Sequence, residues 1–475
     1  MTPTATKTKN LPQDSSSTPP SSTEDTNSSR ACKKKSKKAE SKKAEEVSPP
    51  EPTSQAFTEP TLTEKASPKP TLPTPRSGID ISCSQQKLKE QLSLLSLAVP
   101  SKPTHPILGN VLIVVDELQQ EVTLMVYDLS LGIKTKFPTK VNNPGELALP
   151  VKLLNDIVLR VPSDCTIELE NSQTGLPLTE ENVVCTVRAD SGRYQINGMS
   201  ALEFPVFPEV KSGLTASLPV GILLQGLKRS SFAASSDETK QVLTGVHIKL
   251  EQENVQFAAT DGHRLAVVEI SIQGLGKKQA VIPEPFEFTC PRSALGTLER
   301  MLSMLSDQNS FEAVEIAFDS SSLVAFTTPN AQLVGRCFSG EYPAYQELLK
   351  REFKQQITVE KAPLIVVLER IGILADKKEK TVRLEFDAKE QRICLSIARE
   401  FGSGVETLPA CINGDSISLA FNLKYLLDGI KNVPSSDVQI HLTTESGPAI
   451  LTQFGTRDNP SLAMDLKYLL MPLVS

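Results

Sequence analysis

The stretch from Thr260 to Leu265 holds the side chains that most resemble a reaction centre. Asp261 and His263 lie two residues apart, and a carboxylate that orients an imidazole is a common acid–base pair. A hydrolase that uses His263 is therefore one reading of the sequence. The chain offers no G-x-S-x-G elbow, no Gly-rich phosphate loop and no cluster of metal ligands to complete it. We therefore expect no catalytic residue, no metal and no cofactor, so the protein is predicted not to be an enzyme.

The N-terminal residues 1–78 differ from the rest of the chain. They are rich in Pro, Ser, Thr, Lys and Glu and contain one aromatic residue, Phe57, so they bury too little apolar surface to offset the entropy of ordering. We predict a disordered extension, in which the Lys-rich run from Lys33 to Lys43 is either a solvated segment or a weak contact for nucleic acid. The extension carries 13 Lys/Arg and 9 Asp/Glu. The rest of the chain therefore holds 37 Lys/Arg and 47 Asp/Glu, a net charge of -10.

The remaining composition predicts a soluble intracellular protein. The sequence has no apolar run long enough to cross a bilayer and no secretory signal. Its eight cysteines are widely spaced without a C-x-x-C pair, which is typical of buried, reduced thiols. We expect a cytoplasmic location, although the Thr-, Ser- and Lys-rich start leaves organelle targeting open.

A repeated pattern of helices and strands begins at Ile79. Residues 85–98, 219–234 and 362–376 have helical periodicity, and each is followed by a strand pair, at 111–128, 246–261 and 382–398. A second helix follows in each block, at 148–161, 289–302 and 420–433. Pro150, Pro291 and Asn422 occupy equivalent positions 141 and 131 residues apart, a spacing of about one domain. The sequence thus predicts an α+β fold of three repeated domains, each with two helices packed on antiparallel sheets, at 79–210, 211–349 and 350–475.

The six predicted helices are basic although the body of the chain is acidic. They carry 11 Lys/Arg against 6 acids. Lys and Arg bind phosphate backbones with little regard to base sequence, so this distribution suits a DNA duplex beside the helices. Basic residues also complement helix dipoles at C-terminal ends, so a scaffold with no nucleic acid partner stays open.

Five motifs in order resemble the bacterial DNA polymerase III beta subunit, the DNA sliding clamp, from about Ile79 to Ser475. They are Lys102–Asn110 (KPTHPILGN), Ala259–Ala266 (ATDGHRLA), Tyr342–Tyr345 (YPAY), Tyr425–Asp428 (YLLD) and Tyr468–Leu473 (YLLMPL). The resemblance implies three clamp domains per chain and a closed ring made by a head-to-tail homodimer. It also implies a non-catalytic processivity factor that encircles duplex DNA and tethers the replicative polymerase.

The resemblance assigns two sets of site residues. The first is an apolar groove for partner peptides, implied to be lined by Leu243, Thr260, Gly262, His263, Arg264, Leu265, Pro343, Leu348, Pro448, Met471, Pro472 and Leu473. Within it Arg264 is either a contact or a positioning residue, and YLLMPL is either a groove wall or the completion of a strand. The second set faces DNA: Lys102 by the resemblance, and the helix residues Lys87, Lys152, Arg160, Lys228, Arg229, Arg300, Lys424 and Lys431 by their charge.

Implied partners are the polymerase catalytic subunit, the clamp-loader ATPase, and repair or translesion polymerases. In this family a basic residue usually ends the chain, whereas Val474 and Ser475 stand here, which puts an ionic contact from that end in doubt. The rivals are a monomeric peptide-binding scaffold that never encloses DNA and the hydrolase considered above.

Overall fold

The computed structural model describes residues 78–171, 183–190, 192–273, 280–308, 312–350, 352–375, 380–444, 446–457 and 463–473. The N-terminal extension, apart from residue 78, and the two last residues lie outside these ranges, so the expectations on them are not addressed by the structure. No helix of the described ranges is long and apolar enough to span a membrane.

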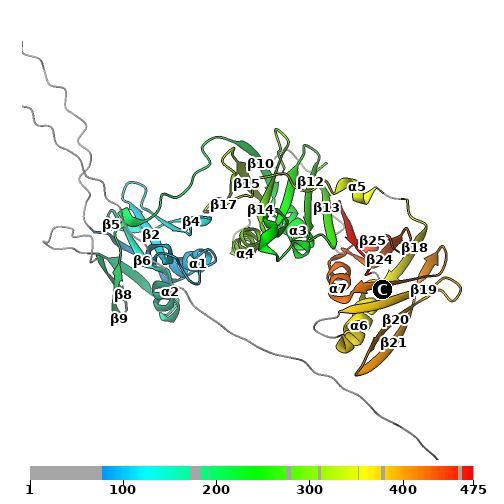
Figure 1. Ribbon diagram of the computed structural model, residues 1–475. Coiled ribbons are helices and arrows are strands. Elements are labelled where there is room, and N and C mark those ends of the chain that lie inside the picture. The colour runs from blue at the N-terminus through cyan, green and yellow to red at the C-terminus, as the bar shows by residue number, and fades with distance from the viewer. Residues whose placement is uncertain are drawn as a thin grey trace, which may run out of the picture. The chain divides into compact units, whose positions relative to one another are not determined.

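Within the described residues, the first block contains two long helices and nine strands, and Figure 1 shows the two helices beside the strands. Its helices are α1 (Gln85–Leu95) and α2 (Val151–Arg160), with the short 3-10 turns η1 (Pro106–Gly109) and η2 (Ala201–Glu203). Its strands are β1 (Asp80–Ser84), β2 (Asn110–Asp116), β3 (Glu121–Tyr127), β4 (Leu131–Pro138), β5 (Lys140–Asn143), β6 (Gly145–Pro150), β7 (Thr166–Glu170), β8 (Val183–Ala189) and β9 (Gly192–Gly198).

The second block repeats this plan. Its helices are α3 (Val220–Ser230) and α4 (Arg292–Gln308), with η3 (Ser231–Ala233) and η4 (Glu238–Thr244). Its strands are β10 (Leu214–Pro219), β11 (Gly245–Leu250), β12 (Asn254–Thr260), β13 (Arg264–Ser271), β14 (Phe286–Pro291), β15 (Ala313–Phe318), β16 (Leu323–Thr327) and β17 (Ala331–Arg336).

The third block follows a linker that holds the one-turn helix α5 (Gln346–Leu349). Its helices are α6 (Lys361–Ile371) and α7 (Leu423–Asn432), with η5 (Gly372–Leu374). Its strands are β18 (Gln355–Glu360), β19 (Thr381–Asp387), β20 (Arg392–Arg399), β21 (Gly402–Pro409), β22 (Cys411–Asn413), β23 (Ile417–Asn422), β24 (Ser435–Leu442), β25 (Ala449–Arg457) and β26 (Met464–Leu470).

Two of the four sheets continue from one block into the next. The eight-stranded sheet has the order β10-β15-β16-β17-β4-β3-β2-β6, and the nine-stranded sheet has the order β14-β11-β12-β13-β26-β25-β24-β18-β22. The joins are β17 with β4 and β13 with β26, both antiparallel. The other two sheets, β5-β1-β7-β8-β9 and β21-β20-β19-β23, end on β9 and β21.

The two long helices of each block pack against each other and against the sheets, as Figure 1 shows for α6 with α7. Their apolar faces enter the core because buried residues recur at helical spacing, as in Leu88, Leu92 and Leu95 of α1. Strands such as β19 alternate buried and more exposed positions, since one face of the sheet lies on the core. In α7 a Cβ built on Gly429 would lie 2.2 Å from the Tyr468 ring, so only glycine permits this approach of helix to sheet.

The predicted elements are largely confirmed. All six long helices and the three strand pairs form at the predicted places, although α4 runs six residues beyond its predicted end and α5 was not predicted. One expectation on the thiols is wrong, because Cys411 is exposed and Cys394 is half-buried. Cys411 lies in β22, an end strand of its sheet, and Cys394 lies in β20 on the face opposite the buried Ile393 and Leu395.

Candidate protein-docking and DNA-facing sites

The Thr260–Leu265 stretch is the tight connection between β12 and β13. The Asp261 Oδ1 atom accepts hydrogen bonds from the backbone N–H groups of His263 (2.9 Å) and Arg264 (3.1 Å), and Thr260 Oγ1 accepts one from Gly262 N–H (3.1 Å). Gly262 has a φ of +90°, a conformation that glycine adopts without the strain a side chain brings. These local bonds fix the turn and leave His263 exposed at its tip.

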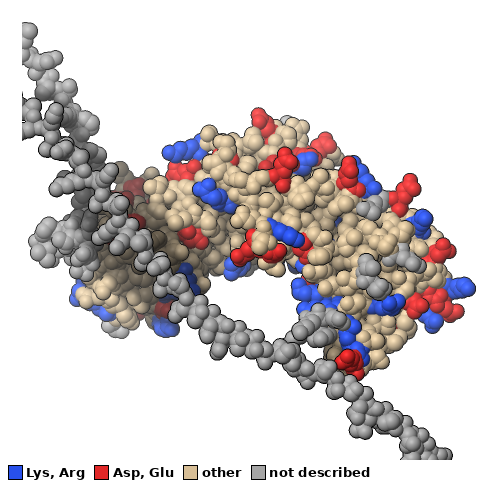
Figure 2. All heavy atoms as spheres, viewed as in Figure 1, with Lys and Arg blue, Asp and Glu red and all other residues tan. Residues whose placement is uncertain are grey.

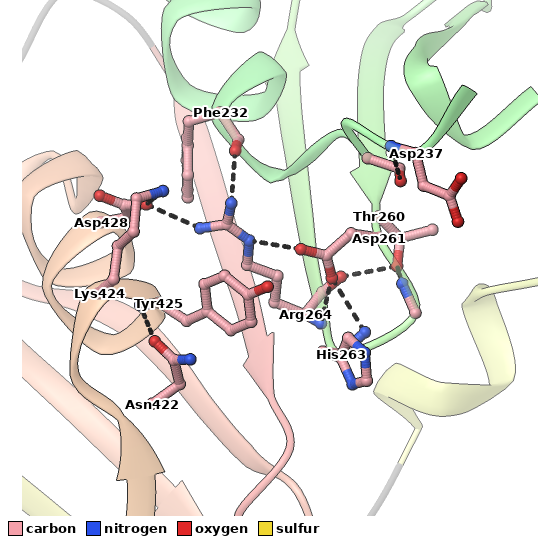
Figure 3. A network of polar contacts seen from close by, with 12 residues as sticks. Phe232, Asp237, Thr260, Asp261, His263, Arg264, Asn422, Lys424, Tyr425 and Asp428 are labelled. Atoms are coloured by element: carbon pink, nitrogen blue, oxygen red, sulfur yellow. Dashed lines mark hydrogen bonds and ion pairs between the residues drawn. The ribbon is translucent and has the colours of Figure 1, made fainter. Parts of the chain in front are cut away.

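The Arg264 side chain turns away from solvent and joins the second block to the third (Figure 3). It is 5% exposed and donates to Asp261 Oδ2 (3.0 Å) and Asp428 Oδ2 (2.9 Å). A third hydrogen bond goes to the carbonyl of Phe232 (2.9 Å), and the guanidinium lies 4.2 Å from the centroid of the Tyr425 ring. A planar group with five donors suits this setting. Arg264 therefore acts here by positioning the hairpin against α7.

The acid–base reading of this stretch finds no support in the geometry. The contacts that the structure shows for the Asp261 carboxylate go to backbone N–H groups and to Arg264. The His263 ring instead lies 6.5 Å from the Tyr425 ring in a stacked orientation. The described ranges also contain no group of three or more His, Cys, Asp or Glu residues that could hold a metal ion.

The end of the chain runs alongside this hairpin. Strand β26 pairs with β13 from Ile270↔Met464 to Arg264↔Leu470, and Met471 N–H then donates to the carbonyl of His263 (3.0 Å). Tyr468 to Leu470 therefore complete strand β26, and Met471 to Leu473 run beyond it. Met471 and Leu473 are each 41% exposed, so apolar side chains face solvent beside His263.

The linker between the second and third blocks packs near the same place. Tyr345 is buried in a small cluster with Leu265, Ile450 and Leu469, against which Tyr342 and Leu349 pack. The remaining expected groove residues border these elements: Pro343 and Leu348 lie in the linker, both exposed, Pro448 immediately precedes β25 and is buried, and Leu243 lies in η4, half-buried.

The DNA-facing set is mostly exposed, with one exception. Lys87, Lys102, Lys152, Arg160, Lys228, Arg300, Lys424 and Lys431 are exposed. Arg229 is 7% exposed and donates to Gln225 Oε1 (3.2 Å) and to the carbonyl of Asn432 (2.7 Å). The expectation that Arg229 faces DNA is therefore wrong, because it caps the C-terminal end of α7, where a cation meets unpaired carbonyl groups.

The exposed cations occupy the helices and a neighbouring loop. Lys152 Nζ donates to the carbonyl of Ser101 (3.3 Å), which places α2 beside the loop that carries Lys102. On α7, Lys424 pairs with Asp428 (3.3 Å) and Lys431 with Glu369 of α6 (2.6 Å). Figure 2 shows Lys and Arg side chains gathered over the region of α6 and α7, whereas acids and bases mix elsewhere on the visible face.

Three residues that matter to the site were not predicted. Phe232, Tyr425 and Asp428 surround the Arg264 guanidinium. The YLLD motif contained two of them, and a Tyr and an Asp three apart on one helix can face a common partner. No sequence signal marked Phe232, which contacts Arg264 through its backbone carbonyl and through its ring, whose centroid lies 5.6 Å from the guanidinium.

The fold defines a class: repeated α+β clamp chains with paired helices and with sheets shared between domains. Models of the DNA polymerase III beta subunit match the chain as N-terminal domain at 79–208, central domain at 217–344 and C-terminal domain at 346–472. The beta sliding clamp of Synechococcus elongatus is 40% identical over 392 residues, covering 82% of this chain and 98% of the relative. That of Synechocystis sp. is 40% identical over 399 residues, covering 82% and 98%.

A solved structure agrees with these matches in fold. The DNA polymerase sliding clamp of Bacillus subtilis superposes with a TM-score of 0.73 at 24% identity, covering 84% of this chain and all of that one. The chain therefore belongs to the beta sliding clamp family, the DNA polymerase III beta subunits. It is a DNA sliding clamp, a non-catalytic processivity factor of DNA replication.

Proposed function

We propose that two copies of this chain close head to tail into a ring around duplex DNA, with β21 of one protomer paired to β9 of its partner. The pattern of strand pairing carries this proposal. In the first block β4 pairs with the last strand of the second block, β17, and in the second block β13 pairs with the last strand of the third, β26. The same rule pairs β21, the equivalent strand of the third block, with β9, the last strand of the first.

The two free edges have the properties that such a junction needs. Each is an end strand of its sheet, and unpaired edge strands readily pair with another chain. Both also expose apolar side chains: Val405 of β21 is 66% exposed, Phe401 beside it 69%, and Tyr194 of β9 43%. A heterologous contact that closes after two copies gives a ring and not a filament.

The solution mass tests this junction. Wild type is expected to have the mass of two chains, and Val405→Asp is expected to yield monomers with an unchanged circular dichroism spectrum. Val366→Asp is the matched control, because Val366 is a 53% exposed apolar residue on α6 of the same block. A monomeric wild type, or a dimer that survives Val405→Asp, contradicts the junction.

The ring would hold DNA by topology, with the exposed helix cations and Lys102 as sequence-independent contacts. Phosphate contacts weaken steeply with salt because bound counterions are released. Binding to linear duplex DNA should therefore fall steeply between 50 and 200 mM salt, by a factor on the order of 10³ for about six contacts. A loaded ring should remain on closed circular DNA at the higher salt.

The same proposal makes the surface beside His263 a groove for linear peptides of partner proteins. The exposed Met471 and Leu473 supply adaptable apolar contacts, and the Arg264 network holds the opposite wall rigid. Pseudomonas aeruginosa and Bartonella birtlesii clamps have been solved bound to griselimycin, and this chain shares their fold. Deleting residues 471–475 should sharply weaken binding of a polymerase-derived peptide while the dimer persists.

The partners in this proposal are the replicative polymerase, the clamp-loader ATPase that opens the ring, and repair or translesion polymerases that present groove peptides. The protein would act in the cytoplasm, associated with the nucleoid. A monomeric scaffold would bind peptides but would not be retained on circular DNA, so the two assays together separate it from a clamp.

A further inference from the structure

A cavity of about 540 Å³ is lined in part by the linker residues Tyr342 and Pro343. Its floor comes from β11 and β14, and the segment from Phe338 to Gln346 covers it. The volume falls in the range of ligand-binding cavities in proteins. Neither the proposed groove nor the DNA-facing helices account for it. Six aromatic side chains line it: His247, Phe288, Phe318, Phe338, Tyr342 and Tyr345.

The aromatic walls are held by one another and by a hydrogen bond. The His247 ring stacks on Tyr342 at 5.0 Å between centroids with an interplanar angle of 10°, and Tyr345 meets it edge-on at 6.4 Å. Thr289 Oγ1 lies 3.1 Å from His247 Nδ1, which fixes the imidazole. Phe288 and Phe318 stack at 5.3 Å. The cavity is thus preformed, so a ligand need not order these side chains on binding.

The charge of the lining is negative. Glu287, whose side chain is 58% exposed, and the exposed Glu341 contribute two carboxylates. Neither Lys nor Arg is among the described residues that line the cavity. Burial lowers the pKa of His247 despite the nearby Glu287, so its imidazole is neutral at pH 7. The cavity beside Arg264 differs in charge, since Lys240, Arg292 and Lys424 line it together with Asp237, Asp261 and Asp428.

An aromatic cavity with carboxylates at its rim suits a cation on an apolar stem. The faces of aromatic rings attract ammonium and guanidinium groups, and the methylene chains of Lys and Arg pack on apolar surface while the charged head stays near water. A purely apolar occupant would leave both carboxylates unused. An acidic occupant would be repelled by them.

We propose that this cavity receives a Lys or Arg side chain of the partner segment that docks in the groove beside His263. Continuity with the groove supports this choice of occupant. Pro343 belongs to the expected groove and also lines the cavity, so a peptide that crosses Pro343 comes within reach of both. The inference rests on the proposed groove and adds a charge preference to it, which would separate partners by the residues that flank their apolar motif.

Synthetic peptides test the preference directly. The probe is the clamp-binding segment of the cognate polymerase, made as a series in which each flanking position in turn carries Lys or norleucine, which has the stem without the charge. For at least one position, the Lys peptide should bind wild-type clamp about five- to ten-fold more tightly, from the usual strengths of cation–π and surface ionic contacts.

Clamp variants then locate the effect. The ratio of the affinities of the Lys and norleucine peptides should fall below about two-fold in the Glu287→Gln, Glu341→Gln double variant. The ratio should persist in the control variant Glu315→Gln, since Glu315 is an exposed acid on β15 of the same block. Norleucine peptides should bind all three proteins equally. Equal binding of Lys and norleucine peptides to wild type at every position, or an equal loss in Glu315→Gln, overturns the cavity assignment while leaving the groove intact. Norleucine peptides that bind wild type and the 471–475 deletion equally overturn the groove itself, and the cavity proposal falls with it.

Discussion

Replacing Arg264 tests whether the hairpin is held against α7 by this one side chain. Arg264→Ala removes two ionic contacts, a hydrogen bond to Phe232 and the stacking on Tyr425. Breaking a buried ion pair by removing one partner costs about 3–5 kcal/mol. Asp428 is 30% exposed and can regain water, so we expect a smaller loss, about 2–3 kcal/mol. Arg264→Lys keeps the charge but not the fork of donors and should lose about half as much.

The measurement is calorimetric unfolding together with the Kd of a groove peptide. A loss of about 2–3 kcal/mol should lower the unfolding temperature of the affected domains by about 5–15 °C, and the loosened hairpin should weaken the peptide by about ten-fold. In a double-mutant cycle with Asp428→Asn, the two changes should be non-additive because the residues share one contact. An Arg264→Ala protein that melts within about 1 °C of wild type and binds peptide normally would refute the positioning role.

Three further predictions concern stability and thiol chemistry. Gly429→Ala should destabilise the protein by more than about 2 kcal/mol because its Cβ meets Tyr468. Gly221→Ala, with no atom within 4 Å of the new Cβ, should be neutral or stabilising. Equal melting temperatures of the two variants would contradict this prediction. Burial lowers the pKa of His247, so the unfolded state binds its proton first and stability falls as pH drops below 6.5. The unfolding temperature of wild type should fall between pH 6.5 and 5, relative to its value at pH 8, and this fall should be smaller in His247→Gln. An equal fall in the two proteins would contradict the linkage. Burial raises the pKa of Cys83 to about 12, so native alkylation at pH 8 should label the exposed Cys411 well before Cys83, as peptide mass mapping can check.

The sequence predicted those parts of the fold that depend on local patterns. Helix α1 follows from leucines at helical spacing after Ser84, whose side chain caps it by accepting from Lys87 N–H. The three strand pairs follow from alternation around polar turns. The end of helix α4 was predicted six residues too early, because four of its last six residues are polar (Ser303, Ser306, Asp307 and Gln308).

Contacts between distant segments could not be predicted in the same way. Arg229 and Lys228 are neighbours in the sequence, yet one caps α7 and the other is exposed, because the rotation of α3 against the third block decides which side chain is covered. The orientation of Arg264 depends likewise on Asp428, 164 residues away. The domain limits at 210 and 349 stay predictions, and the sheets shared by β17 with β4 and by β13 with β26 emerge only in three dimensions.

Retention on circular DNA tests the central claim most directly. The protein is loaded onto a nicked circular duplex by its clamp loader, the salt is raised to disrupt phosphate contacts, and release is followed before and after a restriction enzyme linearises the circle. A closed ring predicts that the protein stays on the circle at high salt and escapes within moments of linearisation. Equal release from circular and linear DNA would contradict encirclement, and with it the junction of β21 and β9.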